Sequence, residues 1–322
     1  MKRCLNKLLA FALLGGLVPL PVLAQDAWPS KPLRLLVAFP PGSPGDTIAR
    51  LISPSLRQTF NQPIVVENKP GASGNIGMQE VIRSTDEHTV LFGVDTMVTI
   101  NPHIYKKLPF KPLEDLVPVT LLAAFSQMLV CHPSVPAKTL PQLLALAHKQ
   151  DFNYASGGQG VPGHMAMEMV LASTQTRMTH VPYRGPAPAM QDVLAGNVPC
   201  GFLASPVVGP FVKDGKLTGI AVSGVKRVAS QPAIPTIEDS GIKGYDATFF
   251  EIVAMPRKTP TARMLRLQQA IAKALESPEV RAALATLDLE PVGNTPEAAA
   301  RRLKEEGIKW GVVASRVNLQ VD

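Results

Sequence analysis

Two glycine-rich loops, each between an expected strand and an expected helix, carry the residues best suited to bind a small anion. The first loop, residues 39–50, reads FPPGSPGDTIAR, and the second, residues 154–164, reads YASGGQGVPGH. Glycines let a ligand approach the backbone closely, and the first turn of the following helix offers unpaired N–H groups and the positive end of its dipole. Each loop is therefore a candidate anion site, and the alternative is that Asp46 and Ser156 only cap their helices.

Patterns for catalysis, cofactors and metals are weak. The second loop contains G-x-G-x-x-G at 158–163, but the segment about 20 residues on, HVPYR at 180–184, lacks the acid that a nicotinamide site needs. Ser73 misses the G-x-S-x-G nucleophile pattern by one residue. The six histidines form no H-E-x-x-H motif, and no cysteine pair has zinc-ligand spacing. We therefore expect a protein that is not an enzyme and has no cofactor and no metal.

Short apolar runs alternate with helical patterns, which is typical of an α/β fold with parallel sheets flanked by helices. Strands are expected at 33–39 and 153–155, before the two loops, and helices after them at 46–60 and 164–173. The loops thus lie where strands give way to helices, which is where α/β sheets bind ligands.

Two apolar stretches predict strands that cross between two lobes. Residues 119–131 form a long apolar run, and residues 249–254 form a second candidate crossing. We expect one lobe from residues 27–125 together with 250–322, and the other from residues 126–249. Because each lobe then carries one glycine loop, a ligand would be held between the two.

The N-terminus has the pattern of a secretory signal peptide over residues 1–24. A basic segment precedes an apolar stretch from Leu8 to Val18, and Val22-Leu23-Ala24 resembles a cleavage site. The stretch is shorter than the ~20 residues of a membrane-spanning helix. We expect cleavage near Ala24/Gln25 and a protein free in the periplasm.

Charge and cysteine content limit the partners. Cleavage would lower the formal net charge from +7 to +4, and the remaining Lys and Arg are scattered, so we expect no nucleic-acid partner. Cys131 and Cys200 lie beyond the signal peptide in apolar, strand-like contexts. A disulfide and two buried free thiols both remain open.

At the glycine loops the chain also resembles the tripartite tricarboxylate transporter substrate-binding family, the Bug or TctC-like periplasmic binding proteins. Similar segments follow the family order over nearly the whole mature chain: WPSKPLR at 28–34, the first loop, VVENKPGASGNIG at 65–77, YASG at 154–157, HVPYRG at 180–185, DVLAG at 192–196 and PTIEDSG at 235–241. The resemblance implies a periplasmic-binding-protein type II-like two-lobed clamshell with two crossing strands. It implies capture of a small mono-, di- or tricarboxylate or an amino acid for delivery to integral-membrane transporter subunits.

The first loop departs from the family pattern. Ser43 replaces its second glycine and Gly45 replaces its threonine, so a threonine hydroxyl is missing and we expect a different substrate from that of better-known members. Asp46 is kept, and we expect it to orient the loop and to accept a hydrogen bond from a ligand hydroxyl or ammonium. Tyr183, Arg184 and Asp192 match the second-lobe motif, with packing and helix capping as their alternative role.

The expected ligand grip combines backbone N–H groups of both loops. The candidate ligand-binding residues are Phe39, Gly42, Gly45, Asp46, Thr47, Asp95, Thr96, Ser156, Gly157, Gly158, Gly160, His164, Tyr183, Arg184 and Asp192. We expect a monomeric solute-binding protein. A carboxylate sensor for a signalling receptor and an exported enzyme on a similar clamshell are the alternatives.

Overall fold

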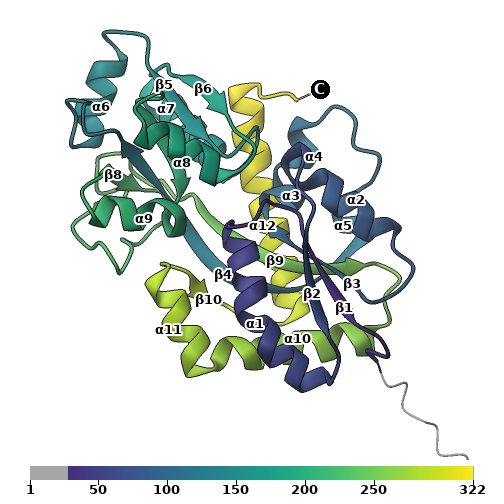
Figure 1. Cartoon of the computed structure of the whole chain (residues 1–322). Helices are drawn as coiled ribbons and strands as arrows, with labels where there is room; N and C mark the ends of the chain where they lie inside the picture. The colour runs from purple at the N-terminus through teal and green to yellow at the C-terminus, as the bar shows by residue number, and fades with distance from the viewer. Residues whose placement is uncertain (1–27, 322) are drawn as a thin grey trace, which may run out of the picture.

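The strands form two parallel groups, one in each lobe of the molecule (Figure 1). The computed structural model describes residues 28–321, so the expected signal peptide lies outside the described residues. In the first lobe, β1 lies between two parallel neighbours, and in the second lobe β5 does the same. These strands are β1 (Leu33–Val37), β2 (Ile64–Asn68), β3 (Thr89–Val94), β5 (Asn153–Ser156), β6 (Thr179–Pro182) and β7 (Cys200–Ala204).

The long strand β4 (Leu116–Cys131) belongs to the sheets of both lobes. Its first part pairs antiparallel with β9 (Thr248–Pro256), and from Gln127 onward it pairs with β7 and β8 (Thr218–Val222). The chain enters β9 from the second lobe at Ala247, whose N–H donates to the carbonyl of Ser223, and β9 then pairs with β3. The two apolar stretches in the sequence therefore correspond to two antiparallel strands that join the lobes.

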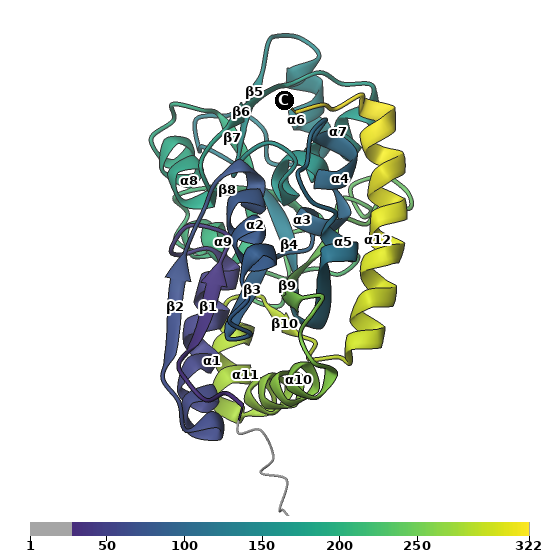
Figure 2. The same cartoon turned by 90° about the vertical axis from the view of Figure 1, so that its right-hand side faces the viewer.

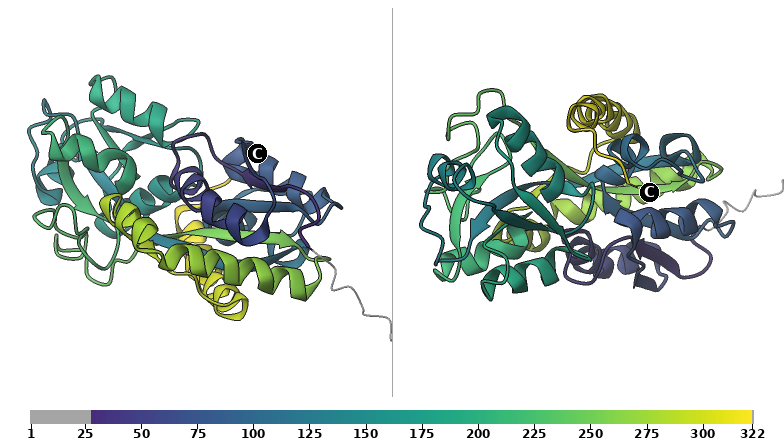
Figure 3. Two further views of the ribbon diagram at one scale, coloured as in Figure 1. Left: turned by 60° about the horizontal axis from the view of Figure 1, so that its bottom comes forward. Right: turned by 90° about the horizontal axis from the view of Figure 1, so that it is seen from above.

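Helices cover the sheets, and many have proline at the first helical positions, where the missing N–H costs nothing. Because Pro44 starts α1, that helix begins two residues earlier than the pattern from Asp46 indicated, and Ser43 is its N-cap. Figure 3 shows the two lobes side by side with α10 and α11 along the first. The helices are α1 (Pro44–Phe60), the 3-10 turn η1 (Ala72–Gly74), α2 (Asn75–Arg83), α3 (Thr96–Thr99), α4 (Asn101–Ile104), α5 (Pro112–Asp115), α6 (Leu140–Ala147), α7 (Pro162–Thr174), α8 (Pro186–Leu194), α9 (Ser205–Lys213), α10 (Thr261–Glu276), α11 (Pro278–Thr286) and α12 (Pro296–Val317).

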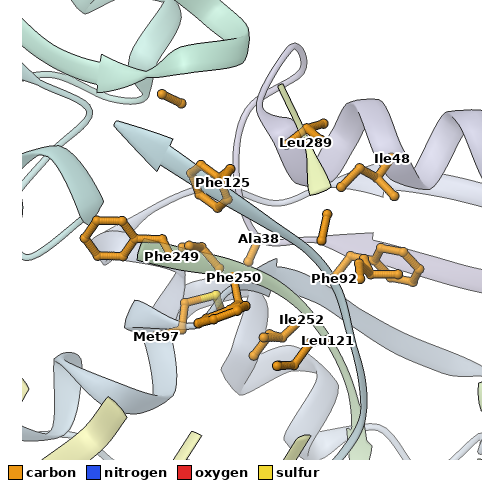
Figure 4. Packing of buried hydrophobic residues seen from close by; sticks show 14 of the residues in the cluster. Ala38, Ile48, Phe92, Met97, Leu121, Phe125, Phe249, Phe250, Ile252 and Leu289 are labelled. Atoms are coloured by element: carbon orange, nitrogen blue, oxygen red, sulfur yellow. The ribbon is translucent and has the colours of Figure 1, made fainter. Parts of the chain in front are cut away.

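Aromatic side chains fill the core where the lobes join (Figure 4). Phe125 on β4 and Phe249 on β9 have ring centroids 6.3 Å apart, and Trp310 of α12 stacks on Phe249 at 5.2 Å. All three are buried. The short strand β10 (Glu290–Pro291) pairs antiparallel with the first part of β4. The joining strands are therefore fixed by packing on the first-lobe side.

The C-terminal helix α12 runs along one side of the molecule (Figure 2). It contacts α3, α4 and β4 and, at the second lobe, α7. After it, Val321 pairs with Tyr105 in a parallel bridge. Within residues 28–321, no helix has both the length and the apolar character needed to span a membrane.

Cys131 and Cys200 form a disulfide between β4 and β7. The two cysteines are direct partners in the antiparallel register of these strands. Of the two states that the sequence left open, the structure contains the disulfide, because the strand pairing brings both side chains to the same place.

Candidate functional site

The first glycine loop uses its own backbone donors. The N–H of Gly42 donates to Asp46 Oδ2 (3.0 Å), and that of Ser43 donates to the carbonyl of Pro40 (3.2 Å). The N–H of Asp46 donates to Ser43 Oγ (3.4 Å), and both the N–H and the hydroxyl of Thr47 donate to the carbonyl of Ser43. The N–H groups that we expected to hold a ligand carboxylate at Gly42, Asp46 and Thr47 are therefore engaged inside the loop.

The Asp46 carboxylate fixes this loop. It is buried and accepts hydrogen bonds from the Gly42 N–H, from Arg50 Nε (3.1 Å) and from Asn68 Nδ2 (2.9 Å). Burial alone would raise the pKa of Asp46, but the hydrogen bonds from Arg50, Gly42 and Asn68 outweigh burial and lower it. Asp46 orients the loop from inside the first turn of α1 and is not its N-cap.

The second loop is held by a histidine pair. Ser156 Oγ accepts from the Gly158 N–H (3.2 Å) and lies 2.6 Å from His180 Nε2, while the Gly160 N–H donates to His164 Nδ1 (3.0 Å). The two imidazole rings stack with centroids 3.9 Å apart. Burial lowers the pKa of His164 to about 3 and that of His180 to about 4, so both rings are neutral near pH 7. Ser156 precedes α7 by several residues and does not cap it; the N-cap is Val161.

The Ser156 and His180 pair is a hydroxyl–imidazole contact that the sequence analysis did not find. His180 Nδ1 has no hydrogen-bond partner among residues 28–321, so the acid that would complete a catalytic triad is missing from the described chain. On the other side of the stack, Tyr154 donates to Glu168 Oε1 (3.0 Å), and His164 Nε2 lies 3.6 Å from the same oxygen. The cluster positions the loop and does not assemble a nucleophile.

A small cavity lies between the lobes, and we call it the inner pocket. Its volume is about 50 Å³. The first turns of α1, α7 and α8 border it, and α9 starts directly after Ala204, so several helix N-termini meet there at the carboxyl ends of the strands. The lining residues are Phe39, Ser43, Pro44, Val94, Phe125, Gln127, Gly157, Val161, Pro162, Gly163, Pro186, Leu203, Ala204 and Glu251.

A larger depression, the outer groove, continues from the inner pocket and shares Phe39, Gly157 and Val161 with it. Its volume is about 670 Å³. It brings Tyr105 and the 70–74 segment of the first lobe opposite Tyr183 and Arg184 of the second. A ligand held in the inner pocket therefore has room to extend outward.

Glu251 is the acidic side chain among the residues that line the inner pocket, and it is not one of the candidates predicted from the sequence. It is 3% exposed, and its Oε2 has no hydrogen-bond partner in the described part of the chain. Burial raises the pKa of Glu251 to about 8, opposed in part by a hydrogen bond from the Gly45 N–H. The available signal was a lone acid within the apolar segment FFEIVA, because an acid is rarely fully buried without a reason.

Gly45 makes room for this carboxyl group. A Cβ added at Gly45 would lie 2.6 Å from Glu251 Oε2. The position where the resemblance expects a threonine side chain is therefore the place where Glu251 fits. The N–H of Gly45, like those of its neighbours in the loop, is directed to a group of the protein itself.

The predicted site residues divide into three sets. Phe39 and Gly157 line the inner pocket, and Gly158, Tyr183 and Arg184 line the outer groove. The remaining ones line neither cavity: Gly42, Gly45, Asp46 and Thr47 in the first loop, Ser156, Gly160 and His164 in the second loop, and Asp95, Thr96 and Asp192 elsewhere.

Asp95 lies behind the wall that Val94 contributes. It is fully buried, and its N–H donates to the carbonyl of Phe250 (2.8 Å). Neither of its carboxyl oxygens has a hydrogen-bond partner within residues 28–321. Burial and the nearby Glu306 raise the pKa of Asp95 well above its usual value. The structure thus places Asp95 and the buried Thr96 outside the inner pocket and the outer groove.

Tyr183 and Asp192 form a pair on the second lobe. The Tyr183 hydroxyl donates to Asp192 Oδ2 (2.5 Å), and Asn197 Nδ2 donates to Oδ1 (3.2 Å). Burial and the bond to Asp192 raise the pKa of Tyr183 to about 12, so the hydroxyl stays protonated. Asp192 thus anchors the tyrosine that lines the outer groove.

Comparison with known proteins identifies the family. The model of the tripartite tricarboxylate transporter family receptor matches residues 48–319. The chain belongs to this family. The match confirms the resemblance in the sequence, and the receptors of this family bind solutes without transforming them. No group of three or more His, Cys, Asp or Glu side chains that could hold a metal ion occurs in the described chain.

Solved structures of similar proteins agree with the receptor in fold. A periplasmic transporter is 33% identical, with a TM-score of 0.87, over 92% of this chain and 100% of the other. An R. palustris protein solved with adipate is 28% identical, with a TM-score of 0.87, over 91% and 99%. MatC of Rhodopseudomonas palustris with bound malate is 27% identical, with a TM-score of 0.82, over 88% and 99%. The receptor therefore has the periplasmic binding protein type II fold.

Proposed function

We propose that this receptor captures a small carboxylate between its lobes and delivers it to the membrane subunits of a tripartite transporter. The observation that carries the proposal is the inner pocket, which is bordered by helix N-termini of both lobes. The adipate and malate bound by two similar proteins support the ligand class. The family description supports the transporter partner.

The second lobe supplies the carboxylate end of the site. Gly163 lies in the first turn of α7, where backbone N–H groups have no partner within the helix. Gln127 Nε2 and Ser205 Oγ, both buried, have no hydrogen-bond partner among the described residues. A partly buried helix N-terminus contributes up to ~2 kcal/mol and a charge-assisted hydrogen bond ~1.5–3 kcal/mol. At the upper ends of these ranges, one helix N-terminus and two such bonds sum to the ~8 kcal/mol of micromolar binding, before the cost of association.

Capture requires the lobes to close on the ligand. We propose that residues 27–125 with 250–322 and residues 126–249 move as two units. The first boundary lies near Gln127, where β4 changes partners. The second lies near Ala247, where the chain enters β9. The outer groove is the entrance, and the mature protein, cleaved near Ala24/Gln25, works as a monomer in the periplasm.

A ligand screen with two matched variants tests the carboxylate site. Calorimetry on the mature protein with mono-, di- and tricarboxylates and amino acids should give at least one micromolar ligand. Gly157→Pro stiffens the second loop and removes one N–H, so it should abolish binding. Arg184→Gln changes an exposed charge of the outer groove and should weaken binding by no more than about tenfold, or ~1.4 kcal/mol. Complete loss in Arg184→Gln with an intact fold would show a direct salt bridge in place of backbone capture.

Uptake measurements test the transport role. Deleting the gene should stop uptake of the carboxylate that the protein binds. Uptake that continues while gene expression changes would instead assign a sensor role.

A further inference from the structure

We propose that Glu251 accepts a hydrogen bond from the end of the ligand opposite its carboxylate, so that the receptor selects carboxylates carrying an amino or hydroxyl group over plain dicarboxylates. This inference rests on the proposed function and narrows its ligand class. Three observations carry it.

The first observation concerns the donors of the first lobe. Hydrogen bonds within the protein engage the N–H groups of Gly42, Ser43, Asp46 and Thr47, and the N–H of Gly45 is directed to Glu251. Pro44, between them, has no N–H. The N-terminus of α1 therefore presents no backbone donor from residues 42–47 to a ligand carboxylate.

The second observation concerns polar side-chain atoms of the inner-pocket residues that have no hydrogen-bond partner. Glu251 Oε2 is an acceptor without a partner, it belongs to a side chain that is 3% exposed, and that side chain lines the inner pocket. Gln127 also lines the inner pocket, and its Nε2 is a donor without a partner among residues 28–321. The pocket thus offers an acceptor on the first-lobe side and donors on the second-lobe side. A ligand with a carboxylate at one end and an amino or hydroxyl group at the other would therefore bind in one orientation.

The third observation is the charge balance around Glu251. The other lining residues of the inner pocket do not titrate. Asp95 is a neighbour at the end of β3, and Asp46 and its partner Arg50 are on α1 behind the loop. A ligand ammonium at Oε2 would meet no other cation of the pocket lining, whereas a second ligand carboxylate would find no cation in that lining to pair with.

A ligand ammonium and a ligand hydroxyl differ in whether their binding releases the proton of Glu251. Burial raises the pKa of Glu251 to about 8, so the empty pocket holds this carboxyl group mostly protonated at pH 7. A ligand ammonium stabilises the ionised form, so Glu251 releases its proton to solvent as the ion pair forms. A ligand hydroxyl donates to the neutral carboxyl group without proton release.

Matched ligands of equal chain length test the inference by calorimetry at pH 7. In four-, five- and six-carbon series, the dicarboxylate, the ω-amino acid, the ω-hydroxy acid and the unsubstituted monocarboxylate differ only at the far end. We expect the amino or hydroxy acid of one series to bind at least tenfold more tightly than its dicarboxylate. In two buffers of different ionisation enthalpy, the amino acid should show release of close to one proton and the hydroxy acid none.

Glu251→Gln serves as the variant, because Gln keeps the size of the side chain and cannot ionise. It should reduce the preference for the amino acid over the dicarboxylate by at least tenfold and abolish proton release, with cooperative melting retained. A dicarboxylate that binds as tightly as its amino and hydroxy analogues would overturn this inference and leave the proposed function standing. If no member of any series and no carboxylate or amino acid of the wider screen binds while the protein is folded, the carboxylate function itself fails.

Discussion

The Glu251 carboxyl group lies against the backbone of Gly45, at a position where any larger residue would place its Cβ 2.6 Å from Oε2. This contact couples the first turn of α1 to the strand that joins the lobes. The Glu251 carboxyl group can occupy this position only because Gly45 has no side chain. The position of the carboxyl group in the pocket lining therefore depends on two residues that are more than two hundred positions apart in the sequence.

Gly45→Ala should displace the Glu251 carboxyl group. Because the added methyl group meets the end of a side chain, the protein should still fold, but affinity for the cognate ligand should fall at least tenfold. Gly307→Ala is the matched control, since a Cβ there meets nothing within 4 Å, and helix propensity should make it neutral or stabilising by up to ~1 kcal/mol. Isothermal calorimetry with both variants decides the matter, and equal affinities would contradict the contact.

Stability should depend on pH through Glu251. Its native pKa is about 8 against an ordinary value of 4.5, so above pH 4.5 the unfolded chain releases a proton that the native protein keeps. The native state therefore loses stability as pH rises from about 5 to 8, by up to roughly 4 kcal/mol. Glu251→Gln removes this contribution, so its advantage over the wild type in urea unfolding should grow between pH 5 and pH 8. A constant difference would show that Glu251 is ionised in the native protein.

Gly163→Ala should destabilise the second lobe strongly. A Cβ at Gly163 would lie 1.8 Å from the carbonyl oxygen of Phe202, which is backbone and cannot rotate away. We expect a loss of about 1–3 kcal/mol or more from forced movement of α7 off β7. Gly209→Ala, in the same lobe, places its Cβ 3.1 Å from the Gln231 side-chain amide and should cost less. Chemical denaturation of both variants measures the difference, and similar losses would be against the prediction.

Removing the disulfide should cost stability without removing the fold. Cys131 and Cys200 are 69 residues apart, so their bond restricts a long segment of the unfolded chain. A native disulfide of this kind contributes about 2–5 kcal/mol. The double variant Cys131→Ser with Cys200→Ser should melt at lower temperature, as should the reduced wild type. Alkylation of both thiols in unreduced, denatured protein would refute the pairing.

The sequence predicted the features that depend on local pattern. Long apolar runs marked β4 and β9, and the glycine loops marked the chain segments at the inner pocket, with Phe39 and Gly157 on its walls. The division into residues 27–125 with 250–322 and 126–249 stays a prediction, as does the ligand role of each candidate residue.

What the sequence did not predict depends on tertiary contacts. No sequence pattern shows that the Asp46 carboxylate already accepts hydrogen bonds from Gly42, Arg50 and Asn68, because Asn68 lies on β2, far from Asp46 in the sequence. Glu251 becomes a pocket residue only when β9 packs beside α1. The disulfide likewise follows from the register of β4 and β7. The residues next to each cysteine in the sequence do not show this register.

The contacts of α12 add another link between the lobes, beside β4 and β9. Since this helix packs on α3 and β4 of the first lobe and on α7 of the second, a movement of the lobes apart would slide α7 along α12 or separate the two. Loaded and empty receptors would then differ on an outer surface that is remote from the pocket. A membrane subunit that docks on this helix would sense occupancy mechanically, without touching the solute.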